Sequence, residues 1–102
     1  MLTIPIKEPW FSMILSGEKK EEYRERKLYW QTRLQSAGLL GGLGHPTEET
    51  RVVCFRNGYG ANRPSFLAEV WADIDIGRPE WGAEKGKTYY VLRIEKVWKV
   101  KP

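Results

Sequence analysis

The chain has 102 residues, a formal net charge of +4 and 41% hydrophobic residues, which predicts a single globular domain over residues 1–102. No apolar run approaches the roughly 18 residues of a membrane span, and Lys7 and Glu8 interrupt the apolar stretch that a signal peptide would need. A single cysteine, Cys54, excludes an internal disulfide and is typical of a reducing compartment. We therefore expect a cytoplasmic protein with no membrane partner.

The opening of the chain predicts a short strand and then a short helix. Residues 2–6 alternate apolar and polar side chains, and Pro5 confines such a strand to a sheet edge or a strand end. Proline is favoured in the first turn of a helix, so a helix is predicted to begin at Glu8-Pro9. Its apolar stripe consists of Trp10, Phe11, Met13, Ile14 and Leu15. Gly17 stands where a left-handed helix end is expected.

Residues 17–27 are charged almost throughout, and two structures remain open for them. A strand would place residues of alternating number on opposite faces, neither of which is apolar. A helix would gain a favourable pair between Glu22 and Arg26. The pattern alone slightly favours the helix over 20–26, and it clearly favours a helix over 27–35. The residues expected to face inward there are Leu28, Trp30 or Gln31, and Leu34.

The rest of the chain predicts a long loop and three strands. Residues 36–50 hold four glycines and Pro46, which indicates a loop. Strands are predicted over 51–56, over 66–75 and from Tyr90 to Glu95, and the second is the strongest because its apolar and polar residues alternate strictly. The last 18 residues carry six basic side chains and one acidic one, interleaved with aromatic rings. That composition favours either contacts to phosphates and bases, with rings from Tyr89, Tyr90 and Trp98, or a solvated basic strand.

Several familiar kinds of site are excluded. Gly86-Lys87-Thr88 resembles the end of a phosphate-binding loop, but Trp81 stands where that motif needs its first glycine. His45 and Cys54 are too few ligands for a structural zinc site, so no metal is expected. The glycine-rich loop lacks dinucleotide-binding spacing, and no cofactor is expected. Cys54 lies in an apolar strand pattern, which favours a buried, inert thiol.

Lys19, Glu22 and Arg24 remain as candidates for a site. If their segment is extended, Glu22 and Arg24 project together, and Lys19 enters from the turn after Gly17. Positive neighbours keep a carboxylate ionised, and partial desolvation lowers the pKa of a lysine. The alternative is a salt-bridged surface segment without a ligand.

The order of residues in this region resembles the opening of the ASCH family. The pattern of that family is a short strand, a helix start with proline and an aromatic residue, and then G-x-K-x-x-E-x-R. Pro9-Trp10 matches the helix start. The four fixed positions of the motif are matched by Gly17, Lys19, Glu22 and Arg24. The resemblance covers about a quarter of the chain.

This resemblance implies an α+β, PUA-like fold, which is a small, mostly antiparallel β-barrel with two or so flanking helices. It therefore favours the strand over residues 20–26. Family members resemble RNA-binding or RNA-processing modules, so we expect RNA, a nucleotide or a modified nucleoside to bind in a charged cleft beside the motif. The expected ligand-binding residues are Trp10, Lys19, Glu22, Tyr23, Arg24 and Arg26, with Trp30 as a further stacking candidate.

One branch of the family consists of small amidohydrolases that act on N4-acylated cytidines, with a lysine, a threonine and a glutamate as the catalytic set. Lys19 matches that lysine, Glu22 stands in place of the threonine, and Glu69 is the candidate for the glutamate. A ribonuclease activity has also been associated with the family. If the protein is an enzyme, the expected catalytic residues are Lys19, Glu22 and Glu69. The sequence leaves binding and hydrolysis open.

Overall fold

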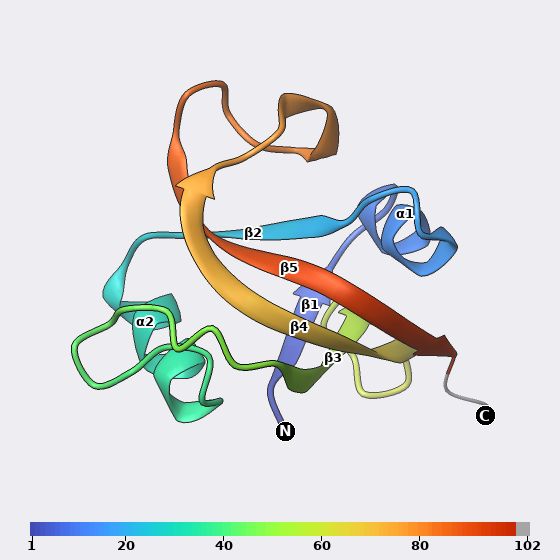
Figure 1. Cartoon of the computed structure of the whole chain (residues 1–102). Coiled ribbons are helices and arrows are strands. Elements are labelled where there is room, and N and C mark those ends of the chain that lie inside the picture. Colours follow the sequence, from blue (N-terminus) through green and yellow to red (C-terminus); the bar gives the residue numbers. More distant parts are fainter. Residues whose placement is uncertain (100–102) are drawn as a thin grey trace.

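The computed structural model describes residues 1–99, which form a curled five-stranded sheet with two α-helices (Figure 1). The strand order is β1-β3-β4-β5-β2, in which only the β1–β3 pair is parallel. The strands are β1 (Thr3–Ile6), β2 (Glu21–Glu25), β3 (Arg51–Asn57), β4 (Ser65–Ile76) and β5 (Thr88–Lys99). The helices are α1 (Trp10–Ser16) and α2 (Leu28–Ser36), and a 3-10 helix spans Pro79–Trp81. The α+β class expected from the sequence is confirmed. No helix in residues 1–99 is long and apolar enough to cross a membrane.

The curvature of β4 and β5 turns the sheet into a half-barrel. These strands have 12 residues each, and their register shifts between Glu69 and Val70. Such a bulge bends a strand and increases its twist, and Figure 1 shows both strands strongly curved. This curvature brings the two edge strands close together. Nη2 of Arg24 in β2 donates a hydrogen bond to the Pro5 carbonyl of β1 at 2.7 Å. Pro5 lies on an edge strand, as its missing N–H predicts.

The core lies on the inner face of the curled sheet, and β4 supplies it by strict alternation. Phe11 and Ile14 of α1 and Leu34 of α2 are buried in the same cluster. The β4 residues in this cluster are Phe66, Ala68, Val70 and Ala72, which confirms the alternation predicted for that strand. Gly17 ends α1 with a left-handed φ of 89°, again as predicted. Ser36 still belongs to α2, and residues 37–50 of the predicted loop contain neither helix nor named strand; Leu39 and Leu40 of this loop are anchored in the core.

Four sequence-based expectations need correction. Residues 21–25 form a strand, so the helix favoured by pattern alone is wrong there. Pairing with β5 compensates for the absence of an apolar face, and tertiary neighbours bury Glu22 on one face of β2 and Tyr23 on the other. Leu28 is 73% exposed, since it is the first residue of α2 and lies beyond the edge of the core. Cys54 is half-buried, because Val53 and Phe55 occupy the core face of β3. Tyr89 and Tyr90 are buried and offer no open rings for stacking. Lys101, one of the six basic residues of the last 18, lies outside the described residues.

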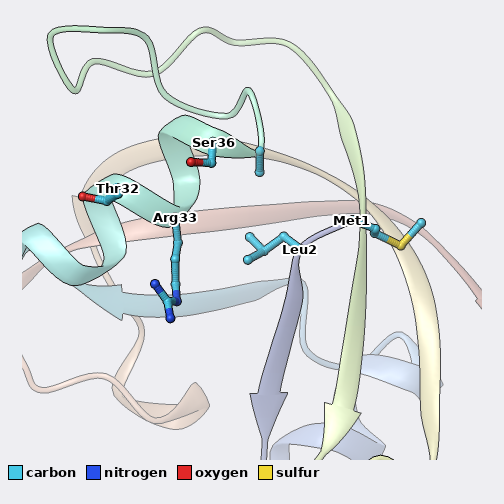
Figure 2. A pocket seen from close by; sticks show the side chains of 6 residues that line it. Met1, Leu2, Thr32, Arg33 and Ser36 are labelled. Carbon is cyan, nitrogen blue, oxygen red and sulfur yellow. The ribbon is translucent and has the colours of Figure 1, made fainter.

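A depression of about 340 Å³ lies between the start of the chain and α2 (Figure 2). Met1 and Leu2 lie on one side of it, and Thr32, Arg33 and Ser36 lie on the other. The guanidinium of Arg33 stacks on the Tyr29 ring, with its Cζ 3.9 Å from the ring centroid. The positive charge of Arg33 is therefore already stabilised by the Tyr29 ring on the surface of α2.

Gly77 gives a test of the packing between β4 and the segment that follows it. A Cβ on Gly77 would lie 2.5 Å from the Ala83 Cβ and 3.0 Å from Tyr23 Cε1. We predict that Gly77→Ala lowers the free energy of unfolding by about 1–3 kcal/mol, because neither neighbour can move without displacing backbone. Gly42→Ala is the matched control, since a Cβ there meets nothing within 4 Å, and it should cost no stability. Urea denaturation of both variants measures the difference, and equal midpoints would contradict this packing.

Candidate ligand-binding cleft

Three charged side chains of the motif segment are buried against one another. The Lys19 side chain is 0% exposed and that of Glu22 is 8% exposed. Lys19 Nζ donates to Glu22 Oε1 and to the Glu21 carbonyl, the latter at 2.7 Å. Arg24 Nη1 donates to Glu22 Oε2 at 2.6 Å. One carboxylate therefore pairs with two cations, and both of its oxygens are occupied.

The local sequence explains how these side chains meet. Gly17 ends α1, and the turn that follows is fixed by the Lys19 N–H, which donates to the Met13 carbonyl at 2.9 Å. The Lys20 carbonyl then accepts from the Ile94 N–H at 2.9 Å, which starts the pairing of β2 with β5. Because side chains alternate along a strand, Glu22 and Arg24 both point to the core face, where Leu92 and Tyr90 are their cross-strand partners.

Burial determines the electrostatics of Lys19. Desolvation lowers the pKa of its ammonium group, while the charge and hydrogen bond of Glu22 oppose that shift. Lys19 Nζ also lies 5.6 Å from the Trp10 ring centroid and 5.1 Å from that of Tyr23, so two aromatic faces stabilise the cation. The positive charge of Lys19 is therefore stable in its buried position only while Glu22 and the two aromatic rings stay in place.

Arg24 joins the buried charges to the rest of the fold. Its Nη1 also donates to the Tyr23 carbonyl at 2.7 Å, and its Nη2 makes the bond to Pro5 described above. The guanidinium carbon lies 5.0 Å from the centroid of the Trp30 ring. One side chain thereby connects β2, β1 and α2, while 14% of it stays exposed.

A cleft of about 390 Å³ opens beside these buried charges. Its most prominent feature is three partly exposed indoles, which come from the start of α1, from α2 and from the segment between β4 and β5. Each indole already has a cation near its ring: Lys19 at Trp10, Arg24 at Trp30, and Arg78 at Trp81 at 5.0 Å. The residues that line the cleft are Trp10, Glu22, Tyr23, Arg24, Glu25, Lys27, Trp30, Trp81, Gly82, Glu84, Lys87 and Tyr89.

The segment of residues 77–87 forms one wall of the cleft and is fastened to the sheet by two tyrosine hydroxyls. The Tyr23 hydroxyl donates to Glu21 Oε1 at 2.8 Å and accepts from the Arg78 N–H at 3.0 Å. The Tyr89 hydroxyl accepts from the Glu84 N–H at 2.9 Å. Burial raises the pKa of the Tyr23 hydroxyl, so it remains protonated and able to donate.

Gly82 allows this wall to touch Trp10. Its φ of +100° is a left-handed conformation that favours glycine, and a Cβ there would lie 3.1 Å from the indole of Trp10. The Gly82 backbone therefore lies directly against the Trp10 ring in the lining of the cleft.

The structure brings together some of the residues expected from the sequence and separates others. Trp10, Glu22, Tyr23 and Arg24 line the cleft, whereas Lys19 is fully buried and bonded to Glu22, and is not among the lining residues. Arg26 is exposed and lies 5.2 Å from the Tyr90 ring centroid, outside the lining.

Glu69 lies on the opposite face of the sheet from Glu22. In β4 the core face carries Ala68 and Val70, so Glu69 between them points away from the core. The structure therefore does not bring Glu69 together with Lys19 and Glu22.

Sequence reasoning missed the residues that the segment after β4 adds to the cleft. Trp81 and Glu84 were not among the residues expected at a site, and Lys87 was considered only as part of the basic end of the chain. The available signal was a tryptophan in a loop beside Gly82, because a large aromatic residue outside any periodic pattern is often part of a site.

No family model, curated protein or solved structure matches this chain. Among residues 1–99, no three His, Cys, Asp or Glu side chains are grouped so as to hold a metal ion. The function proposed below rests on the cleft residues and on the motif.

Glu22 tests whether the buried charges depend on one another. We predict that Glu22→Gln lowers the free energy of unfolding by about 3–5 kcal/mol, because it leaves the Lys19 ammonium buried without a counter-charge. Adding Lys19→Met should restore part of that loss, since the stranded charge is then removed. Glu18→Gln, an exposed neighbour with no ion pair among residues 1–99, should change stability by less than about 0.5 kcal/mol. Urea denaturation compares the four proteins, and a double variant no more stable than Glu22→Gln would contradict the coupling.

Proposed function

We propose that the protein binds RNA or a nucleotide by stacking a base in the cleft between Trp10, Trp30 and Trp81. The observation that carries this proposal is the presence of three partly exposed indoles along one cleft of about 390 Å³. That volume lies within the range of roughly 300–1,000 Å³ that is usual for small-ligand sites. Stacking of a base on an aromatic side chain contributes roughly 1–3 kcal/mol and is independent of base identity.

The charges around the cleft support a ligand with both a phosphate and a base. Lys27 is exposed at the start of α2, and Lys87 forms only a long, half-exposed ion pair of 3.6 Å with Glu25. Exposed pairs of this kind contribute little, so both lysines remain available to a phosphate. Glu84 offers a carboxylate that can accept from a base amino or imino group.

The buried charges take a positioning role in this proposal. Both oxygens of Glu22 are occupied, so Glu22 lines the cleft as a fixed side chain and Lys19 holds it from the buried side. The guanidinium of Arg24 packs against the Trp30 ring at one side of the cleft, and the small exposed part of the Arg24 side chain remains accessible to the ligand.

The fold and the motif together support the finer assignment to an ASCH domain with a PUA-like fold. Along the chain, a short strand and a short helix precede the strand that carries the charged motif, which is the order that the resemblance implies. The half-barrel sheet agrees with the implied fold. In this assignment the motif maintains the cleft, and the tryptophans contact the ligand.

Removal of one indole tests the binding proposal. We predict that Trp30→Ala weakens binding of cytidine monophosphate or a short single-stranded RNA by roughly 5- to 100-fold, the equivalent of one lost stacking contact. Titration calorimetry gives the dissociation constants, and circular dichroism checks that the variant remains folded. Tyr59→Ala is the matched aromatic control, because Tyr59 is 89% exposed and lies outside the cleft.

Lys27→Ala provides a second readout that does not depend on core packing. It should reduce the slope of log affinity against log salt by about 0.7–0.9 if Lys27 contacts a phosphate. Equal affinities of Trp30→Ala and wild type, together with an unchanged salt slope in Lys27→Ala, would contradict the proposal.

A second candidate function is hydrolysis of an N4-acylated cytidine or of an RNA phosphodiester. The observation that favours it is Lys19, whose pKa is lowered by burial beside Glu22, the carboxylate that reaches the cleft. Glu22 would act as the base after releasing one of its two cations, and Lys19 would orient it. Glu69 has no part in this mechanism because of its place on the opposite face.

Turnover separates the two candidates. We expect the wild-type protein to bind N4-acetylcytidine and short single-stranded RNA without converting them, because both Glu22 oxygens are held by cations. Chromatography of overnight incubations measures product. Product formed by the wild type and absent with Lys19→Met, while Lys19→Met keeps its affinity for the substrate, would instead establish the hydrolase.

A further inference from the structure

A chain of hydrogen bonds crosses the sheet face opposite the core and ends at the wall of the cleft. Register places Arg93 of β5 between Glu21 of β2 and Trp71 of β4. Arg93 Nη1 donates to Glu21 Oε2 at 2.7 Å, and Glu21 Oε1 accepts from the Tyr23 hydroxyl at 2.8 Å. The same hydroxyl accepts from the Arg78 N–H at 3.0 Å. Two side chains thus connect the middle of β5 with the backbone of the wall segment, residues 77–87.

Two carboxylates of β4 fix the direction of the Arg93 guanidinium. Its Nε and Nη2 donate to Asp73 Oδ2 at 3.0 and 2.8 Å, and Nη2 also donates to Asp75 Oδ2 at 3.0 Å. A guanidinium is planar and rigid, so holding one edge of it fixes the direction of the other. The Arg93 side chain is 24% exposed and that of Glu21 is 14% exposed. Nη1 is therefore held toward Glu21 in a partly desolvated place.

Glu21 in turn determines the direction of the Tyr23 hydroxyl. An ionised carboxylate can only accept hydrogen bonds, so the proton of this hydroxyl lies toward Glu21. The hydroxyl oxygen is then free to accept from the Arg78 N–H. The other Glu21 oxygen is bonded to Arg93, so the carboxylate cannot turn away without breaking that ion pair.

The position of Arg78 determines where Trp81 lies. The Arg78 carbonyl accepts from the Trp81 N–H at 2.9 Å and from the Ala83 N–H at 3.2 Å. The Arg78 guanidinium carbon also lies 5.0 Å from the centroid of the Trp81 ring. Trp81 lines the cleft, whereas neither Glu21 nor Arg93 is among the lining residues.

We propose that Arg93 and Glu21 are positioning residues for the cleft. They act through the Tyr23 hydroxyl to hold Arg78 and thereby keep the Trp81 indole in place for a stacked ligand. Side chains that contact a ligand need such support, because a ring that moves freely stacks less well. The effect on the ligand rests on the proposed function, whereas the hold on Arg78 can be measured without a ligand.

Hydrogen exchange of the Arg78 amide in the ligand-free protein, followed by NMR, tests the hold. Tyr23→Phe removes the acceptor, and Arg93→Met should accelerate this exchange by roughly 2- to 10-fold, the equivalent of weakening one hydrogen bond. Arg93→Met should add nothing in the Tyr23→Phe background, because it acts only through the hydroxyl. The Glu84 amide, which is held by Tyr89, should keep its wild-type rate in Arg93→Met, which separates this effect from a general loosening.

Titration with cytidine monophosphate tests the consequence for the cleft. Arg93→Met should weaken binding by roughly 2- to 10-fold although Arg93 lies outside the lining. Arg93→Lys should keep most of the affinity, because an ammonium group can still donate to Glu21. Arg51→Met is the matched control, since Arg51 also forms an ion pair, with Glu49, and lies outside the cleft. It should match wild type in both measurements.

The outcomes separate this inference from the proposed function. A wild-type exchange rate of the Arg78 amide in Arg93→Met would overturn the inference and leave the cleft in place. Faster exchange with unchanged affinity, while Trp30→Ala is impaired, would also overturn it, because the hold on Arg78 would then not matter to the ligand. Faster exchange in Arg93→Met together with wild-type affinity of Trp30→Ala would support the hold and overturn the stacking of a base in the cleft.

Discussion

The pairing of one carboxylate, Glu22, with Lys19 and Arg24 is the interaction on which the rest of this structure depends. A charge taken out of water must find compensation within the fold, and here the compensation comes from the same short segment. Arg24 extends the consequence beyond β2, because its second nitrogen bonds to Pro5 and brings the two edges of the sheet together. The buried charges thus lie at the start of β2 and join the two edges of the half-barrel.

The cleft follows from this closure. With β1 and β2 held together, the first residue of α1 and the third residue of α2 come to the same edge of β2, and each brings a tryptophan. The segment after β4 adds the third indole, and the hydroxyls of Tyr23 and Tyr89 hold that segment by hydrogen bonds to its backbone. In the proposed function the charged motif residues support the aromatic cleft, which agrees with their burial although they resemble a set of ligand contacts.

The cleft at the β2 edge has the size of a pocket for one small ligand. It combines indoles with cations, and Lys27 in its lining forms no ion pair within residues 1–99.

The sequence by itself determined the elements whose patterns are local: the edge strand with Pro5, the helix ended by Gly17, the alternating strand β4 and the loop of residues 36–50. It also singled out Lys19, Glu22 and Arg24, and their order along the chain rather than their composition predicted a strand there. Tertiary structure alone decided which of them reach the cleft, because exposure depends on neighbours distant in sequence, such as Pro5 and Trp30. It also decided the part played by Trp81 and the face of β2 to which Glu22 turns, and therefore the separation of Glu22 from Glu69. Neither could be predicted, because the path of a loop and the face that a strand without an apolar pattern turns to the core are fixed by packing and register, which the order of residues in one segment does not contain.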